Sequence, residues 1–291
     1  MAILVNSETK VCVQGITGKA GTLHTGTMLE YGTKIVSGVR PGAEGEEVLG
    51  IPVFNRVSTA VEETGANSSI IFVPAAMAKG AALEAINAGI KLIVIIPEHV
   101  PLHDELEIMQ AAEDSGIVVV GPNTPGLIAP SLKCKIGFVP NKYYIPGSVG
   151  VMARSGTLTY EIVSRLTLAG IGQSTAIGVG GDPVIGSRFP DLIKKFEADP
   201  ETKVILLIGE VGGTQEEEAA ALVADGKIKK PVVAYIAGFS APPGKRLGHA
   251  GAIISGSQGT MESKLKSFQK AGIAVAKTPS EVLDLVKQKL R

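Results

Sequence analysis

Short apolar runs rich in β-branched residues alternate with longer amphipathic segments through most of this chain. Such runs are typical of strands, and strands that alternate with helices build βαβ units. Helices then cover both faces of a parallel sheet, which explains why the apolar runs are nearly continuous instead of alternating with polar residues. The pattern therefore predicts an α/β protein.

The alternation is interrupted once, and the interruption divides the chain. Residues 1–124 are predicted to form a Rossmann-like, doubly wound domain, with strands at 10–14, 34–39, 69–73, 92–96 and 117–121. Residues 125–146 are rich in Pro, Gly and Asn and are predicted to be a linker. A second open-sheet domain is predicted over 147–291, since a chain of 291 residues is long enough for two cores. Its strands are predicted at 148–153, 172–179, 204–209, 232–237 and 274–276, and its helices near 157–169, 215–224, 260–271 and 280–289.

Composition excludes several classes of partner. The 28 basic and 28 acidic side chains balance and form no basic run, so the chain lacks the electrostatic footprint of a nucleic-acid-binding protein. The longest apolar runs are far shorter than the roughly 20 residues that span a bilayer, and no secretory signal pattern is present. Cys12 and Cys134 lack metal-ligand spacing, so we predict no metal site in this chain and a reducing, cytoplasmic compartment.

A glycine-rich turn from Gly15 to Gly21 follows the first predicted strand and leads into a helix. Its G-x-x-G-x-x-G spacing lets backbone amides face a pyrophosphate at a helix N-terminus, although glycines at this turn also serve packing alone. The second strand ends at Arg40, where an NAD site would carry an acidic residue. An arginine suits the ribose phosphate of NADP or of coenzyme A, and a solvated surface arginine is the alternative.

Polar loops also follow the strands predicted in the second half. Ser155 or Thr157 caps a helix beside Gly156 and offers amides and a hydroxyl to a phosphoryl group, whereas a plain N-cap needs no ligand. Asp182 follows consecutive glycines and either fixes that turn or belongs to the site. Glu210 emerges from an apolar strand and is either a structural hydrogen-bond acceptor or the partner that orients a histidine.

His249 is the leading candidate for a reactive group. It lies in a glycine-punctuated loop in which Gly248 and Gly251 leave backbone amides unshielded, and Lys245 and Arg246 add positive charge. A loop histidine that only makes ordinary hydrogen bonds is the alternative. Because parallel strands end at a common sheet edge, the topology allows the loops of the second half to meet there.

These motifs, taken together and in order, resemble the alpha-subunit family of succinyl-CoA synthetase. The matching runs are the turn at Gly15–Gly21 and residues 155–161, 180–183, 209–213 and 248–252, and they cover nearly the whole chain. The resemblance implies a CoA-binding domain followed by a flavodoxin-like ligase domain. It also implies a reversible reaction in which succinate, coenzyme A and ATP or GTP form succinyl-CoA through a phosphohistidine and an acyl phosphate.

The resemblance further assigns roles to individual residues. It maps the phosphorylated histidine onto His249 and its orienting glutamate onto Glu210. It implies CoA contacts at Thr17, Gly18, Lys19, Ala20, Ile96, Pro97 and Glu98, and a tyrosine near the substrate at Tyr160. The residues themselves add Arg40 as an expected CoA contact, and Asn123, Ser155, Gly156 and Thr157 as expected contacts to substrate and phosphate.

Some positions depart from the family pattern. The usual Pro-Gly-Lys reads Pro41-Gly42-Ala43, so a CoA-binding lysine is absent and Arg40 or Lys19 is the proposed replacement. Changes near Glu98 and at Thr124 lie where the acyl group and the thiol should meet. Malate and citrate are therefore alternative acids, for which His99 or His103 would supply added donors, and succinate is the first expectation.

No Walker-type loop is present, so nucleotide binding must come from elsewhere. By the resemblance it comes, with Mg²⁺, from a beta subunit of ATP-grasp fold, in an αβ or α2β2 assembly in a bacterial or archaeal cytoplasm. Two other classes stay open: an NADP-dependent oxidoreductase, which would leave the His249 and Glu210 loops unexplained, and a non-catalytic CoA-binding regulator.

Overall fold

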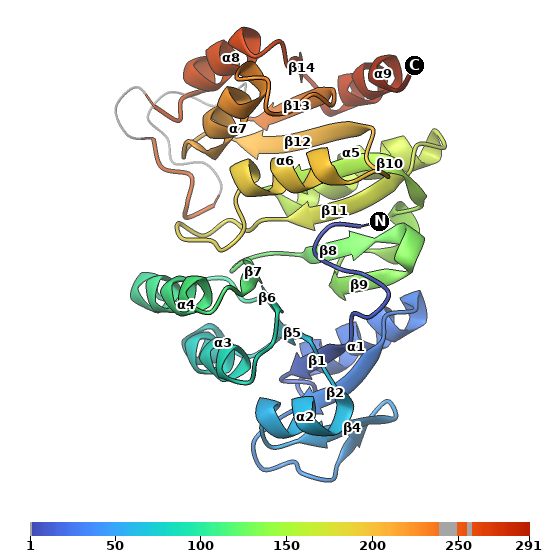
Figure 1. The fold of residues 1–291 in the computed structure, drawn as a ribbon, viewed down its shortest axis with the longest axis vertical. Coiled ribbons are helices and arrows are strands. Elements are labelled where there is room, and N and C mark those ends of the chain that lie inside the picture. The colour runs from blue at the N-terminus through green and yellow to red at the C-terminus, as the bar shows by residue number, and fades with distance from the viewer. Residues whose placement is uncertain (1, 239–248, 255–257) are drawn as a thin grey trace.

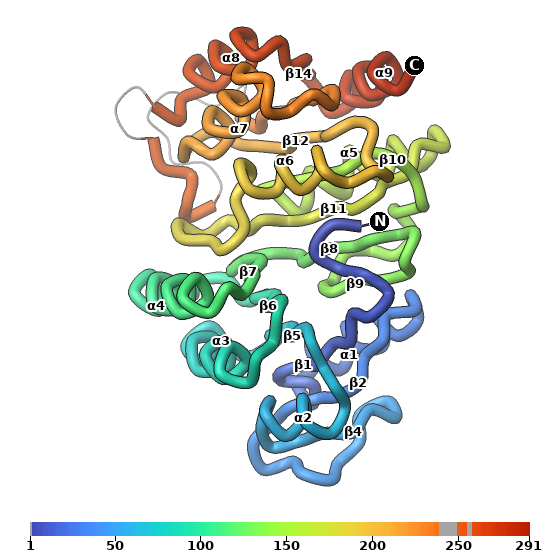
Figure 2. Tube along the Cα trace, in the orientation of Figure 1, coloured from blue at the N-terminus to red at the C-terminus, as the bar shows by residue number. Residues whose placement is uncertain are grey.

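The computed structural model describes residues 2–238, 249–254 and 258–291. These residues form two seven-stranded sheets with helices on their faces, one in each half of the chain (Figure 1). The tube in Figure 2 shows the two sheets as successive layers, with the chain passing between them after β7 (Val118–Val120). The α/β class and its division into two sheets are confirmed.

The first sheet has the strand order β3-β4-β2-β1-β5-β6-β7. The remaining strands are β1 (Val11–Gln14), β2 (Ile35–Val39), β3 (Glu47–Val48), β4 (Ile51–Phe54), β5 (Ser68–Ile71) and β6 (Leu92–Ile95). All neighbours are parallel except β3 and β4. That hairpin was not predicted, because its strands are short and its two-residue turn, Leu49 and Gly50, lacks an Asn-Gly or Asp-Gly signal although both residues have positive φ.

Helices cover the two faces of the first sheet. They are α1 (Lys19–Tyr31), α2 (Val57–Thr64), α3 (Ala78–Asn87) and α4 (Leu102–Asp114). Residues of α2, α3 and α4 share one core with alternate strand residues such as Cys12 and Ile93. The other alternate residues, such as Val13 and Val94, share a core with Met28 of α1, so the strands are buried on both faces.

The second sheet has the order β14-β13-β12-β10-β11-β8-β9. Its strands are β8 (Gly126–Ala129), β9 (Cys134–Gly137), β10 (Pro146–Ala153), β11 (Gln173–Gly178), β12 (Val204–Glu210), β13 (Val232–Ala237) and β14 (Ala274–Ala276). The antiparallel β8–β9 hairpin lies inside the predicted linker, 125–146, and pairs with β11. This segment is therefore part of the second sheet, and Pro and Gly mark its turns and bends.

Helices α5 (Gly156–Leu168) and α9 (Pro279–Leu290) share one core beneath the second sheet. The opposite face is covered by α6 (Phe189–Ala198), α7 (Gln215–Ala224) and α8 (Met261–Lys270). Helix α6 was not predicted, although its buried residues Phe189, Leu192, Ile193 and Phe196 follow helical spacing. Among the described residues, no helix has the length and apolar character needed to cross a membrane.

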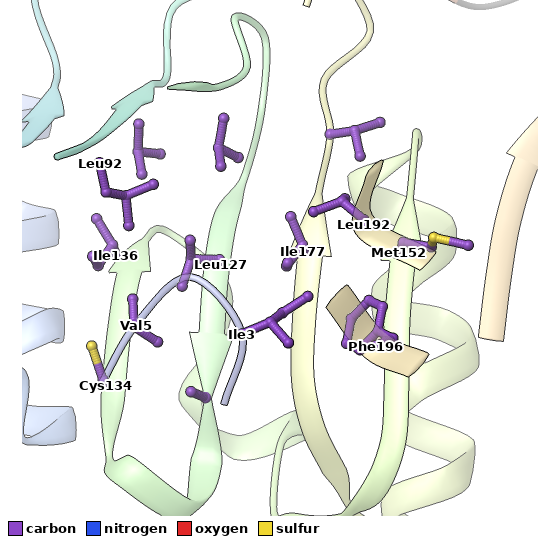
Figure 3. Packing of buried hydrophobic residues seen from close by; sticks show 14 of the residues in the cluster. Ile3, Val5, Leu92, Leu127, Cys134, Ile136, Met152, Ile177, Leu192 and Phe196 are labelled. Carbon is purple, nitrogen blue, oxygen red and sulfur yellow. The ribbon is translucent and has the colours of Figure 1, made fainter. Parts of the chain in front are cut away.

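One core joins the two halves of the chain. The amide of Ile3 donates to Oγ1 of Thr175 in β11 over 3.2 Å, so the N-terminal segment lies on the second sheet before β1 enters the first. Figure 3 shows Ile3 and Val5 packed among Leu127 and Ile177 of the second sheet, in the same cluster as residues of the first. This packing sets the loops of both sheets beside each other at the site.

Candidate active site

His249 and Glu210 meet at the end of β12, as the sequence predicted. Nδ1 of His249 lies 3.1 Å from Oε1 and 3.0 Å from Oε2 of Glu210. Both side chains are largely shielded, with 27% of His249 and 10% of Glu210 exposed. A carboxylate only accepts hydrogen bonds, so Nδ1 carries the proton and Nε2 is the nitrogen left to react.

The surroundings of His249 act on its protonation in opposite directions. The hydrogen bond from His249 to Glu210 raises the pKa of the imidazole above its ordinary value, and partial burial opposes that shift. The charge of Glu210 adds to the increase, whereas the charge of Arg154 lowers the pKa. The pair is therefore suited to stabilise positive charge on the ring, which forms whenever the lone pair of Nε2 binds a third substituent while Nδ1 keeps its proton.

A buried ionic network lies behind Glu210. Arg154 is 4% exposed, and its Nη2 lies 3.1 Å from Oε1 of Glu210 while its Nη1 lies 3.5 Å from Oε1 of Glu216. Nη1 also donates to the carbonyl of Gly212 over 2.7 Å. The fully buried Lys264 continues the network at 2.7 Å from Oε2 of Glu216. Arg154 therefore links the Glu210 carboxylate, which contacts His249, to the buried Glu216 and Lys264.

Sequence reasoning did not assign a role to Arg154, Glu216 or Lys264. Arg154 precedes the Ser155 motif, and its position at a predicted strand end was the one available signal. Lys264 lies on α8, more than fifty residues beyond Glu210, and looks in the sequence like an ordinary surface lysine of an amphipathic helix. The contact between these residues depends on the packing of α7 and α8.

Glycines allow the loops to approach His249 closely. A Cβ atom on Gly181 would lie 2.3 Å from Cδ2 of His249, so a larger residue would displace the ring. The amide of Gly251 donates to the carbonyl of Gly181 over 2.9 Å, which joins the two loops. The predicted Gly248, Lys245 and Arg246 lie outside the described residues.

A cleft of about 410 Å³ opens beside His249. Ser155 caps α5, because its hydroxyl accepts from the amide of Leu158 over 3.4 Å, and Gly156 and Thr157 line the cleft. A helix N-terminus attracts anions, and no acidic side chain occupies the first turn of α5. The cleft can therefore hold a phosphoryl group next to the histidine.

The same cleft collects the remaining residues that were expected to contact substrate, Asn123 and Tyr160, together with three that were expected to contact coenzyme A. Its lining includes Ile96, Pro97, Glu98, Asn123 and Tyr160. Within the described residues, the buried hydroxyl of Tyr160 has no hydrogen-bond partner, so it is available to a ligand. The alternative donors lie elsewhere: the side chains of His99 and His103 are 82% and 83% exposed and do not line the cleft.

A second pocket, of about 510 Å³, lies at the glycine-rich turn. Thr17, Gly18 and Arg40 line it, whereas Lys19 and Ala20 are exposed and do not. Ala43, at the position of the absent lysine, is buried and adds no polar group. Arg40 is therefore the cation that the structure places at this pocket.

An aromatic strip that the sequence analysis missed links the two pockets. The His24 ring stacks on Phe72 at 5.5 Å and lies 5.6 Å from Phe138. Phe72 lines the pocket at the glycine-rich turn, and Phe138 lines the cleft beside His249. A long ligand that reaches from one pocket to the other would pass this strip.

Family comparisons agree with the two halves of this arrangement. Residues 6–99 match the model of the CoA binding domain, and residues 152–274 match that of the CoA-ligase family. A fold that joins these domains, with a carboxylate-held histidine at their junction, defines a ligase that uses coenzyme A. Within this class, the chain belongs to the family of succinate–CoA ligase alpha subunits.

Curated relatives show this membership over nearly the whole chain. An ADP-forming succinate–CoA ligase subunit alpha 2 from Archaeoglobus fulgidus is 54% identical, with 98% of this chain and 99% of the relative covered. An ADP-forming succinate–CoA ligase subunit alpha from Aquifex aeolicus is 52% identical, with 100% of this chain and 95% of the relative covered.

Solved structures share the fold. ATP citrate lyase from Methanothrix soehngenii, in complex with citrate and coenzyme A, superposes with a TM-score of 0.88 at 25% identity. The alignment covers 98% of this chain and 50% of that one, so this chain spans half the length of the lyase. An acetyl-coenzyme A synthetase from Ca. Korarchaeum cryptofilum gives a TM-score of 0.75 at 21% identity over 95% of this chain and 60% of its own, which shows likeness of fold.

Proposed function

We propose that this chain carries the phosphohistidine of a succinate–CoA ligase and forms succinyl-CoA reversibly from succinate, coenzyme A and ATP. One observation carries the proposal most directly. Glu210 holds Nδ1 of His249 while the capped N-terminus of α5 lines the same cleft. The printed names of the relatives, which are ADP-forming succinate–CoA ligase subunits, support the choice of acid and nucleotide.

The proposed reaction uses three displacements. Nε2 of His249 attacks the γ-phosphorus, the bond to the bridging oxygen breaks, and the nucleoside diphosphate leaves. A carboxylate oxygen of succinate then attacks the phosphorus, and the P–N bond breaks to give the acyl phosphate and restore His249. The thiolate of coenzyme A attacks the acyl carbon, and phosphate leaves. The thiol proton is released to solvent or to phosphate.

The chain's own residues account for the part of this chemistry that needs a fixed histidine. Glu210 keeps the Nδ1 proton in place through each step, so that the lone pair of Nε2 is regenerated whenever the phosphoryl group leaves. The positive end of the α5 dipole stabilises the phosphoryl oxygens without offering a competing nucleophile.

The nucleotide and Mg²⁺ are proposed to come from a partner. The sequence has no Walker-type loop, and the relatives are named as subunits. We expect the partner to be a beta subunit of ATP-grasp fold in an αβ or α2β2 complex, in the cytoplasm. GTP in place of ATP would leave the chemistry at His249 unchanged, because nucleotide choice would reside in the partner.

Coenzyme A is proposed to lie across both pockets. Its phosphorylated nucleotide end would occupy the pocket at the glycine-rich turn, its long arm would pass the His24 strip, and its thiol would reach the cleft at Asn123. This placement is supported by Arg40 at the first pocket and by Pro97 and Glu98 at the second.

We expect the double variant Arg40→Ala/Lys19→Ala to bind coenzyme A at least about tenfold more weakly, a loss of roughly 1.4 kcal/mol. Arg40 should account for most of this loss, because it lines the pocket and Lys19 does not. Calorimetric titration of each single variant and of the double variant measures both effects. Dephospho-CoA is the matched ligand: wild type should bind it more weakly than coenzyme A, and the Arg40→Ala protein should not distinguish the two. An unchanged dissociation constant in the double variant would reject this role.

The identity of the carboxylic acid substrate is tested by measuring which acid removes the phosphoryl group from the phosphorylated chain. The complex with its beta subunit is labelled with γ-labelled ATP or GTP and Mg²⁺, and acid-labile, base-stable label is followed on this chain. Succinate plus coenzyme A should remove the label within the time of a single turnover. Discharge by malate or citrate alone would keep the phosphohistidine and change the acid, whereas a chain that never takes label would favour a non-catalytic CoA-binding regulator.

A further inference from the structure

Helix α4 of the first sheet places a buried acid against a loop of the second. Glu105 is fully buried, and its Oε2 accepts a hydrogen bond from the amide of Val184 over 3.2 Å. Figure 1 shows α4 beside the loop that follows β11 and contains Val184. Asp182, two residues before Val184, is also buried, at 5% exposed. The contact therefore sets two carboxyl groups together at the junction of the two halves.

Each of these carboxyl groups has one oxygen without a donor. Within the described residues, Oε1 of Glu105 and Oδ2 of Asp182 are buried and accept no hydrogen bond from a donor group. Two ionised carboxylates in this position would repel each other and leave both oxygens without a hydrogen bond. Buried polar atoms are rarely left unpaired, because the loss of hydration is unfavourable in free energy. One proton on Glu105 removes the repulsion and supplies the missing hydrogen bond.

The electrostatics of the junction favour that proton. Burial first, and then the neighbouring Asp182 carboxylate as an acceptor for the protonated form and as a negative charge, raise the pKa of Glu105 to about 8, although the hydrogen bond from the amide of Val184 opposes the shift. Arg154 and Arg188 line the small cavity next to Asp182, but both are engaged elsewhere. Arg154 contacts Glu210 and Glu216, and Arg188 lies 2.7 Å from Glu218. His249 also faces Asp182, whose charge contributes to the raised pKa of the imidazole.

We propose that Glu105 is a positioning residue whose protonated carboxyl donates a hydrogen bond to Asp182 and so holds the 181–184 loop against His249. Asp182 is fixed on its other side by Nδ2 of Asn123, which donates to Oδ1 over 2.9 Å. Gly181 packs on the imidazole ring and accepts from the amide of Gly251. The hydrogen bond between the carboxyl groups thus connects the CoA-binding domain to the histidine loop.

The proton gives this contact a defined pH dependence. In the unfolded chain a glutamate titrates near its ordinary value of 4.5, whereas in the folded chain Glu105 keeps its proton up to about pH 8. Unfolding therefore releases a proton between these values, and stability falls as pH rises through that window. Glutamine at position 105 keeps a donor toward Asp182 and has no proton to lose, so Glu105→Gln removes this dependence.

Two measurements on the full chain test the proposal, and neither depends on the ligase reaction. In carboxyl-carbon NMR, the Glu105 side chain should titrate with a midpoint near pH 8, and a midpoint below about pH 6 would overturn the proposal. The second measurement is thermal unfolding at pH 6 and at pH 9. The decrease in Tm between these two pH values should be smaller for Glu105→Gln than for wild type, by at least about 3 °C. An equal fall in the two proteins would also overturn the proposal.

Further variants show whether Glu105 positions the 181–184 loop through its hydrogen bond or only fills a buried site with a polar side chain. Glu113→Gln, on an exposed face of the same helix, should keep the wild-type pH dependence. Glu105→Met fills the site but cannot donate, so it should shift the NMR signals of the His249 ring even at pH 6, whereas Glu105→Gln should leave them near their wild-type positions. Glutamine and methionine variants that shift the ring signals equally would contradict the role of the hydrogen bond.

Discussion

Replacing His249 with alanine is expected to lower phosphoryl incorporation into this chain by at least on the order of a thousandfold. The imidazole Nε2 is the nucleophile of the proposed reaction, and Glu210, at 3.0 Å from Nδ1, has no other histidine to orient. Loss of a nucleophile cannot be offset by the helix N-terminus, which stabilises charge but does not attack phosphorus. Single-turnover labelling of the complex with γ-labelled nucleotide measures the effect.

Two controls make the His249→Ala result specific. His103→Ala removes an exposed histidine that lies outside the cleft, and it should label at the wild-type rate. Coenzyme A should still bind to the His249→Ala protein with an unchanged dissociation constant, because its phosphates are expected at the pocket of Arg40. Undiminished labelling of the His249→Ala protein would refute the assignment of the phosphoryl carrier.

Replacing Lys264 with methionine is expected to lower the free energy of unfolding by about 3–5 kcal/mol. The ammonium group is fully buried and donates to Oε2 of Glu216 over 2.7 Å, to Oε2 of Glu217 over 2.9 Å and to the carbonyl of Gly213 over 2.9 Å. Without it, the buried Glu216 would keep the longer contact with Arg154 and the hydrogen bond from the amide of Glu210, and no ammonium group would lie at its Oε2. An uncompensated buried charge costs far more than the loss of apolar packing, which methionine largely replaces.

Urea-induced unfolding followed by circular dichroism measures this change. Lys266→Met is the matched control, because Lys266 is exposed on the same helix and its loss should change stability by less than about 0.5 kcal/mol. If Lys264→Met costs no more than this control, the buried network does not stabilise the fold. A stable Lys264→Met protein with slower labelling of His249 would instead assign the network to the chemistry alone.

Much of the architecture could be read from local pattern. The central strands of both sheets, such as β12 and β13, are nearly continuous apolar runs, and burial on two faces is the only environment that suits them. The edges of the sheets were harder to predict. The β8–β9 hairpin is short and is rich in the residues that usually mark linkers, and its strand character comes from pairing with β11.

The site shows the same division between local and distant information. The sequence by itself determined the α/β class and predicted a helix capped by Ser155 or Thr157, of which the structure shows Ser155, because these features are encoded in short runs of residues. The order of the motifs, through the family resemblance, predicted that Glu210 would lie against His249. Only the tertiary structure decided that Arg154 and Lys264 hold Glu210 and Glu216, and that Glu105 accepts a hydrogen bond from Val184 in the other half of the chain. Those contacts join side chains that are far apart in the sequence. The residues around a charged side chain do not indicate whether folding will bury it, because burial depends on which partner the packing of distant elements brings within reach.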